Sequence, residues 1–252
     1  MVNNSLSEIT KRNVKLASLV HGGFHTKGIT KLLREKGYSY IIVSPYSKTD
    51  INEENYHFLL SGRRKPIEEL LKKEFDLYRG KQISHPLMEA NGIKAIPFKH
   101  EKLDYWRDAL RGGIEYLHTP TNLLFSGGID DIWVGPDGQL FIVDYKSTSK
   151  EEEVNIDADW QISYKRQMEI YQWLFKMNDF KVSPTGYFVY VNGKSDAKAF
   201  DGKLEFDVEL IPYTGSSTWV EPAIFDLKKM LLSDTIPPIG KAFGGGPCDY
   251  CT

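Results

Sequence analysis

Two aspartates and a lysine stand where two neighbouring apolar segments of the chain end. Asp130 ends the first run, and Asp144 and Lys146 close a second run that follows a Gly-Pro-Asp-Gly turn at residues 135–138. In a strand, residues i and i+2 point to the same face, so Asp144 and Lys146 should project together beside the strand that ends at Asp130. Two carboxylates can hold a hard divalent cation, and a neighbouring lysine suits the hydrolysis of a phosphodiester.

The apolar residues before Asp144 indicate how these groups are held. Phe141, Ile142 and Val143 form a continuous run, which is typical of a central strand covered on both faces. An acid and a lysine at the end of such a strand lose solvation, and a metal ion or a charged partner must offset that cost. A D-x-K triplet by itself is common, however, and is most often a solvated ion pair.

Periodic segments surround the two carboxylate strands. Pro66 suits the first turn of a helix, and helical apolar spacing follows it. Residues 80–100 look loop-rich. The remaining pattern predicts a helix over 102–116 that Gly112-Gly113 interrupts, the carboxylate strands, a helix over 162–177, strands over 186–192 and near 206–213, and a helix over 220–232. This order predicts an α/β fold with a mixed sheet.

The first 62 residues have a pattern of their own. A strand is expected at 14–20, a helix at 29–37 and a strand at 38–46, which makes a β-α-β unit of about 33 residues. About 60 residues is little from which to build an independent core. We therefore expect residues 1–62 to be a small N-terminal unit, either packed on the next domain or a fused fragment, and residues 63–252 to form the main domain.

Composition and charge narrow the class of protein. Of 252 residues, 41% are hydrophobic and 26% charged, which is typical of a globular protein with a real core. No apolar run approaches the roughly 20 residues that span a bilayer, and the polar N-terminus lacks a secretory signal, so we expect a cytosolic protein without membrane contact. Residues 82–252 carry 17 Lys and Arg against 25 Asp and Glu, which argues against tight, non-specific coating of nucleic acid.

Three motifs in this order resemble the PD-(D/E)xK phosphodiesterase superfamily, and within it the RecB/Cas4-like branch. Gly127-Gly128-Ile129-Asp130 matches the G-x-x-D run, and Asp144-Tyr145-Lys146 matches D/E-x-K. Gln167 and Tyr171 match Q-x-x-x-Y, and their spacing of four places them on one helix face. The resemblance implies a restriction-endonuclease-like core, which is a mixed central sheet flanked by helices.

The resemblance also implies a metal site. Asp130, Asp144 and the main-chain carbonyl of Tyr145 would bind Mg²⁺ or Mn²⁺, which would lower the pKa of a bound water and neutralise charge on the scissile phosphate. Lys146 would orient that water and stabilise the developing negative charge. Asp131 is an alternative ligand, but the spacing fits Asp130 better.

Further site residues follow from the same resemblance. Gln167 and Tyr171 would steady the lysine or touch the nucleic-acid backbone, although both could be ordinary residues of a helix surface. Family members also carry an acidic or histidine residue on the helix before the sheet. Glu68 is the best match, with Glu69 and Glu74 as alternatives.

Two further sequence features have no complete chemical interpretation. Cys248 and Cys251 form a C-x-x-C pair that resembles the C-terminal cysteines of Cas4-like proteins, but the sequence has no other cysteine, so a complete iron–sulfur cluster within one chain is not expected. His21 and His25 flank a Gly-Gly turn that could hold an anion or a phosphate-bearing nucleotide at a helix N-terminus. A tight turn with exposed histidines explains the same residues.

We therefore predict a Mg²⁺-dependent nuclease that hydrolyses single- or double-stranded DNA as an exo- or endonuclease, in repair, recombination or defence. The alternative is a catalytically inactive nuclease fold that serves as a nucleic-acid-binding or assembly module. The acidic charge of the second part of the chain, the indirect assignment of Glu68 and the incomplete cysteine set motivate that alternative.

Overall fold

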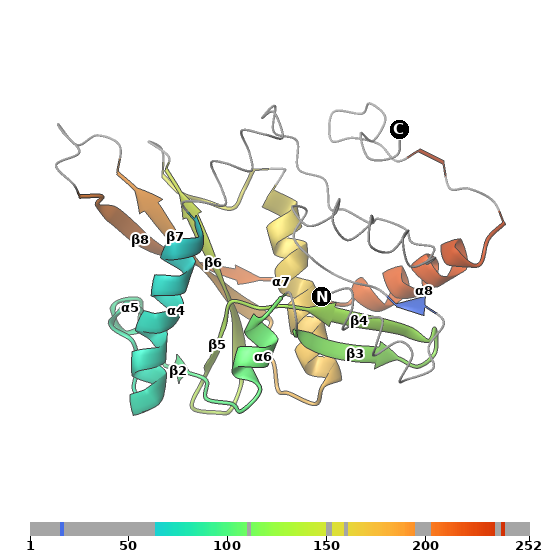
Figure 1. Ribbon diagram of the computed structural model, residues 1–252, viewed down its shortest axis with the longest axis horizontal. Coiled ribbons are helices and arrows are strands. Elements are labelled where there is room, and N and C mark those ends of the chain that lie inside the picture. The colour runs from blue at the N-terminus through green and yellow to red at the C-terminus, as the bar shows by residue number, and fades with distance from the viewer. Residues whose placement is uncertain are drawn as a thin grey trace.

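The computed structural model describes residues 16–17, 64–109, 112–149, 153–158, 161–194, 203–234 and 238–239. Its elements in chain order are β1 (Leu16–Ala17), α4 (Arg64–Lys81), α5 (Pro86–Ala90), β2 (Ile96–Pro97), α6 (Leu103–Arg107), β3 (Ile114–His118), β4 (Leu123–Gly127), β5 (Asp131–Val134), β6 (Leu140–Thr148), α7 (Ile162–Met177), β7 (Thr185–Gly193), β8 (Phe206–Thr214) and α8 (Val220–Leu231). The strands form two sheets, and Figure 1 shows the helices packed beside them.

A five-stranded sheet in the order β2-β5-β6-β7-β8 forms the centre of the fold. The pairs β2·β5, β5·β6 and β7·β8 are antiparallel, whereas β6 and β7 are parallel. Parallel neighbours need a crossover, and α7 lies between β6 and β7 in the chain. This mixed sheet with flanking helices confirms the predicted α/β, restriction-endonuclease-like fold.

Strand β6 is covered on both faces, as its apolar run predicts. Ile142 belongs to a buried cluster that includes Met168 and Leu174 of α7, whereas Val143 belongs to a second cluster that includes Phe75 of α4. Neighbouring residues of a strand point to opposite faces, so α7 and α4 cover opposite sides of β6. The alternation along β6 therefore decides which helix each of its polar residues meets.

The second sheet has the order β1-β4-β3. The helix expected over 102–116 is wrong in its second half. Helix α6 ends at Arg107, and residues 114–118 form strand β3, which pairs antiparallel with β4. Gly113 has a φ of 110°, a conformation that ends helical structure and favours glycine. The loop-rich stretch 80–100 contains α5 and β2, which are too short to give a periodic signal.

The strand predicted at 14–20 contains β1, which pairs in parallel with β4. The remainder of the predicted N-terminal unit lies outside the described residues, as do His21, His25, Cys248 and Cys251. The boundary at residues 62–63 stays a prediction. No helix in the described part of the chain combines the length and apolar character that crossing a bilayer requires.

The packing of α4 against the sheet can be tested at Phe75. Its side chain is fully buried and stacks on Trp133 of β5 at a ring-centroid distance of 5.5 Å. We expect Phe75→Ala to lower the free energy of unfolding by about 3–5 kcal/mol. The matched change Leu77→Ala, at a side chain that is 66% exposed on the same helix, should cost less than about 1 kcal/mol. Chemical denaturation measures both, and equal losses would contradict this packing.

Candidate active site

Asp130 lies beside the middle of β6, just beyond the point where the β5·β6 ladder ends, because β5 begins only at Asp131. The β5·β6 pairing starts at Asp131, which is opposite Val143. The next β6 amide on that side, the N–H of Tyr145, donates instead to Oδ2 of Asp130 at 3.0 Å. The sequence placed Asp130 at the end of a strand, whereas β4 ends at Gly127 and Asp130 lies in the connection to β5. Its carboxylate thus replaces a backbone acceptor.

Asp144 and Lys146 project from the same face of β6 and form an ion pair. The Lys146 ammonium also lies 4.5 Å from the centre of the Tyr164 ring of α7. Asp144 is buried, and its Oδ2 accepts no well-directed hydrogen bond from any described residue although Lys146 lies against it. Among the described residues, the buried charge of Asp144 is therefore balanced by the Lys146 ammonium.

The two carboxylates have opposite pKa shifts. Burial raises the pKa of Asp144 to about 6, and the negative charge of Asp130 adds to this rise. Burial also acts to raise the pKa of Asp130, but two lysines outweigh it and hold that pKa below its ordinary value. One of them, Lys72 of α4, lies 3.0 Å from Oδ1 of Asp130. The positive charge of Lys72 thus acts mainly on Asp130, and the two aspartates have different pKa values.

Helix α4 also brings Glu68 to the cluster, one turn before Lys72. Burial raises the pKa of Glu68 to about 7, with Asp130 as the next largest cause and Asp144 as a further one. The two alternatives lie differently, because Glu69 is exposed and Glu74 contacts Nε2 of His85 at 3.0 Å. Of the three candidate acids on this helix, Glu68 is the one whose raised pKa reflects the charges of the two aspartates.

The Gln167 and Tyr171 pair lies on the α7 side of the same cluster. Nε2 of Gln167 donates to the Tyr171 hydroxyl at 2.9 Å, and Tyr171 is only 6% exposed. Its ring packs against Gly127, where an added Cβ would lie 2.7 Å from Cε1 of the ring. Burial raises the pKa of Tyr171, and the charges of Asp144 and Asp130 contribute. The structure thus brings together all three predicted motifs.

Asp131 has a different environment from Asp130, although the two are adjacent. It is fully buried, and its Oδ2 accepts from the Tyr145 hydroxyl at 2.7 Å. Its Oδ1 accepts from Arg107 at 2.8 Å and also pairs with Arg79. All of its charge is used within the fold, so the alternative of Asp131 as a metal ligand has no support in this geometry. Sequence reasoning did not find either arginine.

A divalent cation fits the donors that converge here. In the described part of the chain, no three His, Cys, Asp or Glu side chains form a preassembled metal centre. Two adjacent carboxylates are present nonetheless, and Oδ2 of Asp144 lacks a well-directed donor from the described residues. Mg²⁺ commonly uses one or two carboxylates and keeps several waters, so this donor set is sufficient for it.

Comparison with known families agrees with this geometry. A family model of the PD-(D/E)XK nuclease superfamily matches residues 55–252, which is more than half of the chain. The chain belongs to the PD-(D/E)XK nuclease superfamily. No curated protein matches its sequence. Membership places the chain among nuclease-type hydrolases of nucleic acid, a group that generally uses divalent metal ions.

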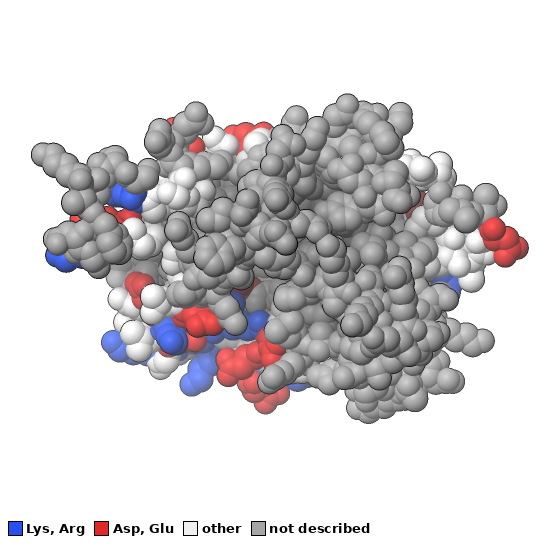
Figure 2. All heavy atoms as spheres, turned by 45° about the horizontal axis from the view of Figure 1, so that its top comes forward, with Lys and Arg blue, Asp and Glu red and all other residues white. Residues whose placement is uncertain are grey.

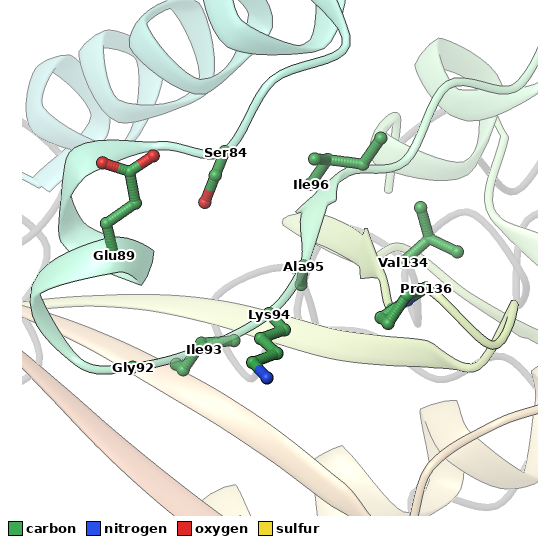
Figure 3. Close-up of a pocket in the computed structure, with 10 residues that line it drawn as sticks. Ser84, Glu89, Gly92, Ile93, Lys94, Ala95, Ile96, Val134 and Pro136 are labelled. Carbon is green, nitrogen blue, oxygen red and sulfur yellow. The ribbon is translucent and has the colours of Figure 1, made fainter.

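The surface of this PD-(D/E)XK superfamily member carries mixed charge. Figure 2 shows basic and acidic side chains of the described residues side by side, without a broad field of one sign in that view. An apolar groove of about 590 Å³ lies between Ile93–Ile96 and Val134–Pro136 (Figure 3). Its described lining residues include none of the predicted site residues, so the groove is separate from the carboxylate cluster.

The close packing of Tyr171 on Gly127 gives a first prediction for the site. Gly127→Ala should lower the free energy of unfolding by about 1–3 kcal/mol, because the new methyl group overlaps the ring. In a Tyr171→Leu background, Gly127→Ala should lower the free energy of unfolding much less. A double-mutant cycle by urea denaturation measures this difference. Additive losses would show that the two positions do not meet.

The raised pKa of Glu68 gives a second prediction. A carboxyl group whose folded pKa is about 7, against its usual 4.5, leaves stability unchanged at pH 4 and lowers it as the pH rises between these values. In EDTA at pH 8, Glu68→Gln should therefore be more stable than wild type, by up to about 2 kcal/mol after allowance for solvent screening. The two proteins should be equally stable at pH 4.

Glu69→Gln, at the exposed neighbouring position, is the matched control. Thermal denaturation across this pH range should show no comparable gain for it. A gain of the same size in both variants, or none for Glu68→Gln at pH 8, would contradict the placement of Glu68 beside the two aspartates.

Proposed function

We propose that this protein is a Mg²⁺-dependent deoxyribonuclease of the RecB/Cas4-like type, which hydrolyses phosphodiester bonds in single- or double-stranded DNA as an exo- or endonuclease. The proposal depends on one observation: Asp130 and Asp144 converge with Lys146 beside the middle of β6. Membership in a nuclease superfamily supports it.

Asp130, Asp144 and the main-chain carbonyl of Tyr145 would hold Mg²⁺ or Mn²⁺. The cation would activate a water for attack and neutralise charge on the scissile phosphate. The residues are suited to this because Tyr145 fixes Asp130 through its amide, while Oδ2 of Asp144 has no well-directed donor among the described residues. When a cation takes this position, Lys72 and Lys146 can release part of their pairing with the aspartates.

Lys146 would then direct its ammonium toward the attacking water and the phosphate oxygens. A positive charge at this point stabilises the negative charge that develops in the transition state. The Tyr164 ring, 4.5 Å from this ammonium, limits where the side chain can lie. We assign Lys146 an orienting and electrostatic role on these grounds.

Glu68, Gln167 and Tyr171 would complete the site from the two flanking helices. Glu68 would accept a proton or orient a water near the two aspartates, a role supported by the interaction of its charge with both. The Gln167 and Tyr171 pair, joined at 2.9 Å, would hold the space in front of Gly127 and touch the nucleic-acid backbone. Each of these roles is part of the proposal.

A cleavage assay tests the proposal. Labelled linear single- and double-stranded DNA is incubated with wild type in Mg²⁺, in Mn²⁺ and in EDTA, and products are resolved on denaturing gels. We expect metal-dependent cleavage, with activity lowered about a hundredfold or more in Asp144→Asn and Lys146→Met. Binding of the same DNA, measured by fluorescence anisotropy, should persist in both variants.

A second aspartate–lysine pair provides the control. Asp137 and Lys181 contact each other at 3.0 Å, and both side chains are more than half exposed. Asp137→Asn and Lys181→Met should leave cleavage unchanged. Equal products from wild type and the two site variants would overturn the assignment. DNA binding by wild type without cleavage in any metal would favour the catalytically inactive binding or assembly module.

A further inference from the structure

The segment that carries Asp130 is held in place by α6. The amide of Ile129 donates to the carbonyl of Trp106 at 3.0 Å. Gly128 lies so close to the second residue after α6 that an added Cβ would fall 2.6 Å from Cα of Ala109. The backbone that leads into Asp130 therefore lies directly against the end of this short helix.

Arg107, the last residue of α6, makes the contact that bears on Asp130 itself. Its Nε donates to the main-chain carbonyl of Asp130 at 3.0 Å. Its two terminal nitrogens bind elsewhere: one donates to both oxygens of Asp76, at 2.9 and 3.0 Å, and the other to Asp131 at 2.8 Å. The Arg107 side chain is 9% exposed. A planar guanidinium held at all three nitrogens has little freedom to move.

This arrangement fixes Asp130 from two sides. Arg107 holds its carbonyl, and the Tyr145 amide holds Oδ2 of its side chain at 3.0 Å. Asp130 lies in a connection between strands, where the backbone is not fixed by a ladder. Without the guanidinium, the main chain at Asp130 can rotate, and a small rotation there moves the carboxylate away from Asp144.

We propose that Arg107 is a positioning residue that fixes the Asp130 carboxylate for metal binding, an inference that rests on the proposed function for the identity of the ligand. Arg107 acts through the backbone of Asp130 and through Asp131, and it touches neither the nucleic acid nor the metal. A lysine at this position keeps the charge for Asp76 and Asp131 but cannot supply three separate donors in one plane.

Arg79 provides a matched control within the same network. Its guanidinium pairs with Asp76 and Asp131, as that of Arg107 does, and its side chain is 8% exposed. Its Nε, however, donates to the carbonyl of Phe98 at 2.7 Å and not to Asp130. Arg79→Lys and Arg107→Lys therefore disturb the same two carboxylates, but only the second change releases the backbone of Asp130.

The experiment compares these two variants in two ways. In metal-free protein, hydrogen exchange at the Tyr145 amide, followed by NMR, reports whether the Asp130 carboxylate still accepts its hydrogen bond. We expect exchange at this amide to be about tenfold faster in Arg107→Lys than in Arg79→Lys. Mn²⁺ binding, measured by electron paramagnetic resonance, should be weakened about tenfold to a hundredfold in Arg107→Lys alone.

Equal exchange and equal Mn²⁺ affinity in the two variants would overturn the positioning role. If Arg107→Lys fails to fold, the wild type still gives a test, because the Nε–H of Arg107 should exchange slowly and rapid exchange would contradict its bond to Asp130. Failure of the proposed function has a different signature. In that case wild type neither cleaves DNA nor binds Mn²⁺, while the difference in Tyr145 exchange between the variants remains.

Discussion

Two carboxylates held near each other beside the buried middle of β6 are the constraint around which this structure is arranged. Like charges in a protein interior repel each other and lose solvation, so both need counter-charges. Lys146 comes from the same strand as Asp144, and Lys72 reaches Asp130 from α4. The aspartates still differ, with one pKa below its ordinary value and the other at about 6. With Glu68, the cluster thus holds three carboxyl groups against two lysines.

Alternation along β6 separates this reactive cluster from a structural one. Asp144 and Lys146 face α7, whereas Tyr145 between them faces α4 and donates its hydroxyl to Asp131. Asp130 and Asp131 are adjacent in sequence, but they too belong to different clusters. One carboxylate is paired with a lysine and a single backbone amide, and the other is enclosed by two arginines and a tyrosine. The enclosed carboxylate can hold the strands while the first remains available to a ligand.

Structural features that follow from the periodicity of a single strand or helix could be predicted from the sequence. The spacing of Asp144 and Lys146 follows from the two-residue period of a strand, and α7 was expected over the residues that form it. The position of Glu68 came from the resemblance alone. Arg79 and Arg107 had no local signal, because they meet Asp131 across 52 and 24 residues of chain. The local pattern of β3 predicts part of a helix, but pairing with the distant strand β4 decides its conformation.

The balance of charge also bears on how a nucleic acid would approach. When Glu68 is ionised, three carboxylates face two lysines and would repel a phosphate backbone, so the bound divalent cation that we propose would change the sign of the local field as well as supply chemistry. In the view of Figure 2, the basic and acidic groups of the described residues lie next to one another. Affinity for DNA would then come from a few cations close to the cluster, and binding should depend on salt less steeply than in a protein that covers many phosphates. Cleavage would be confined to substrates that reach Asp130, Asp144 and Lys146 beside the middle of β6.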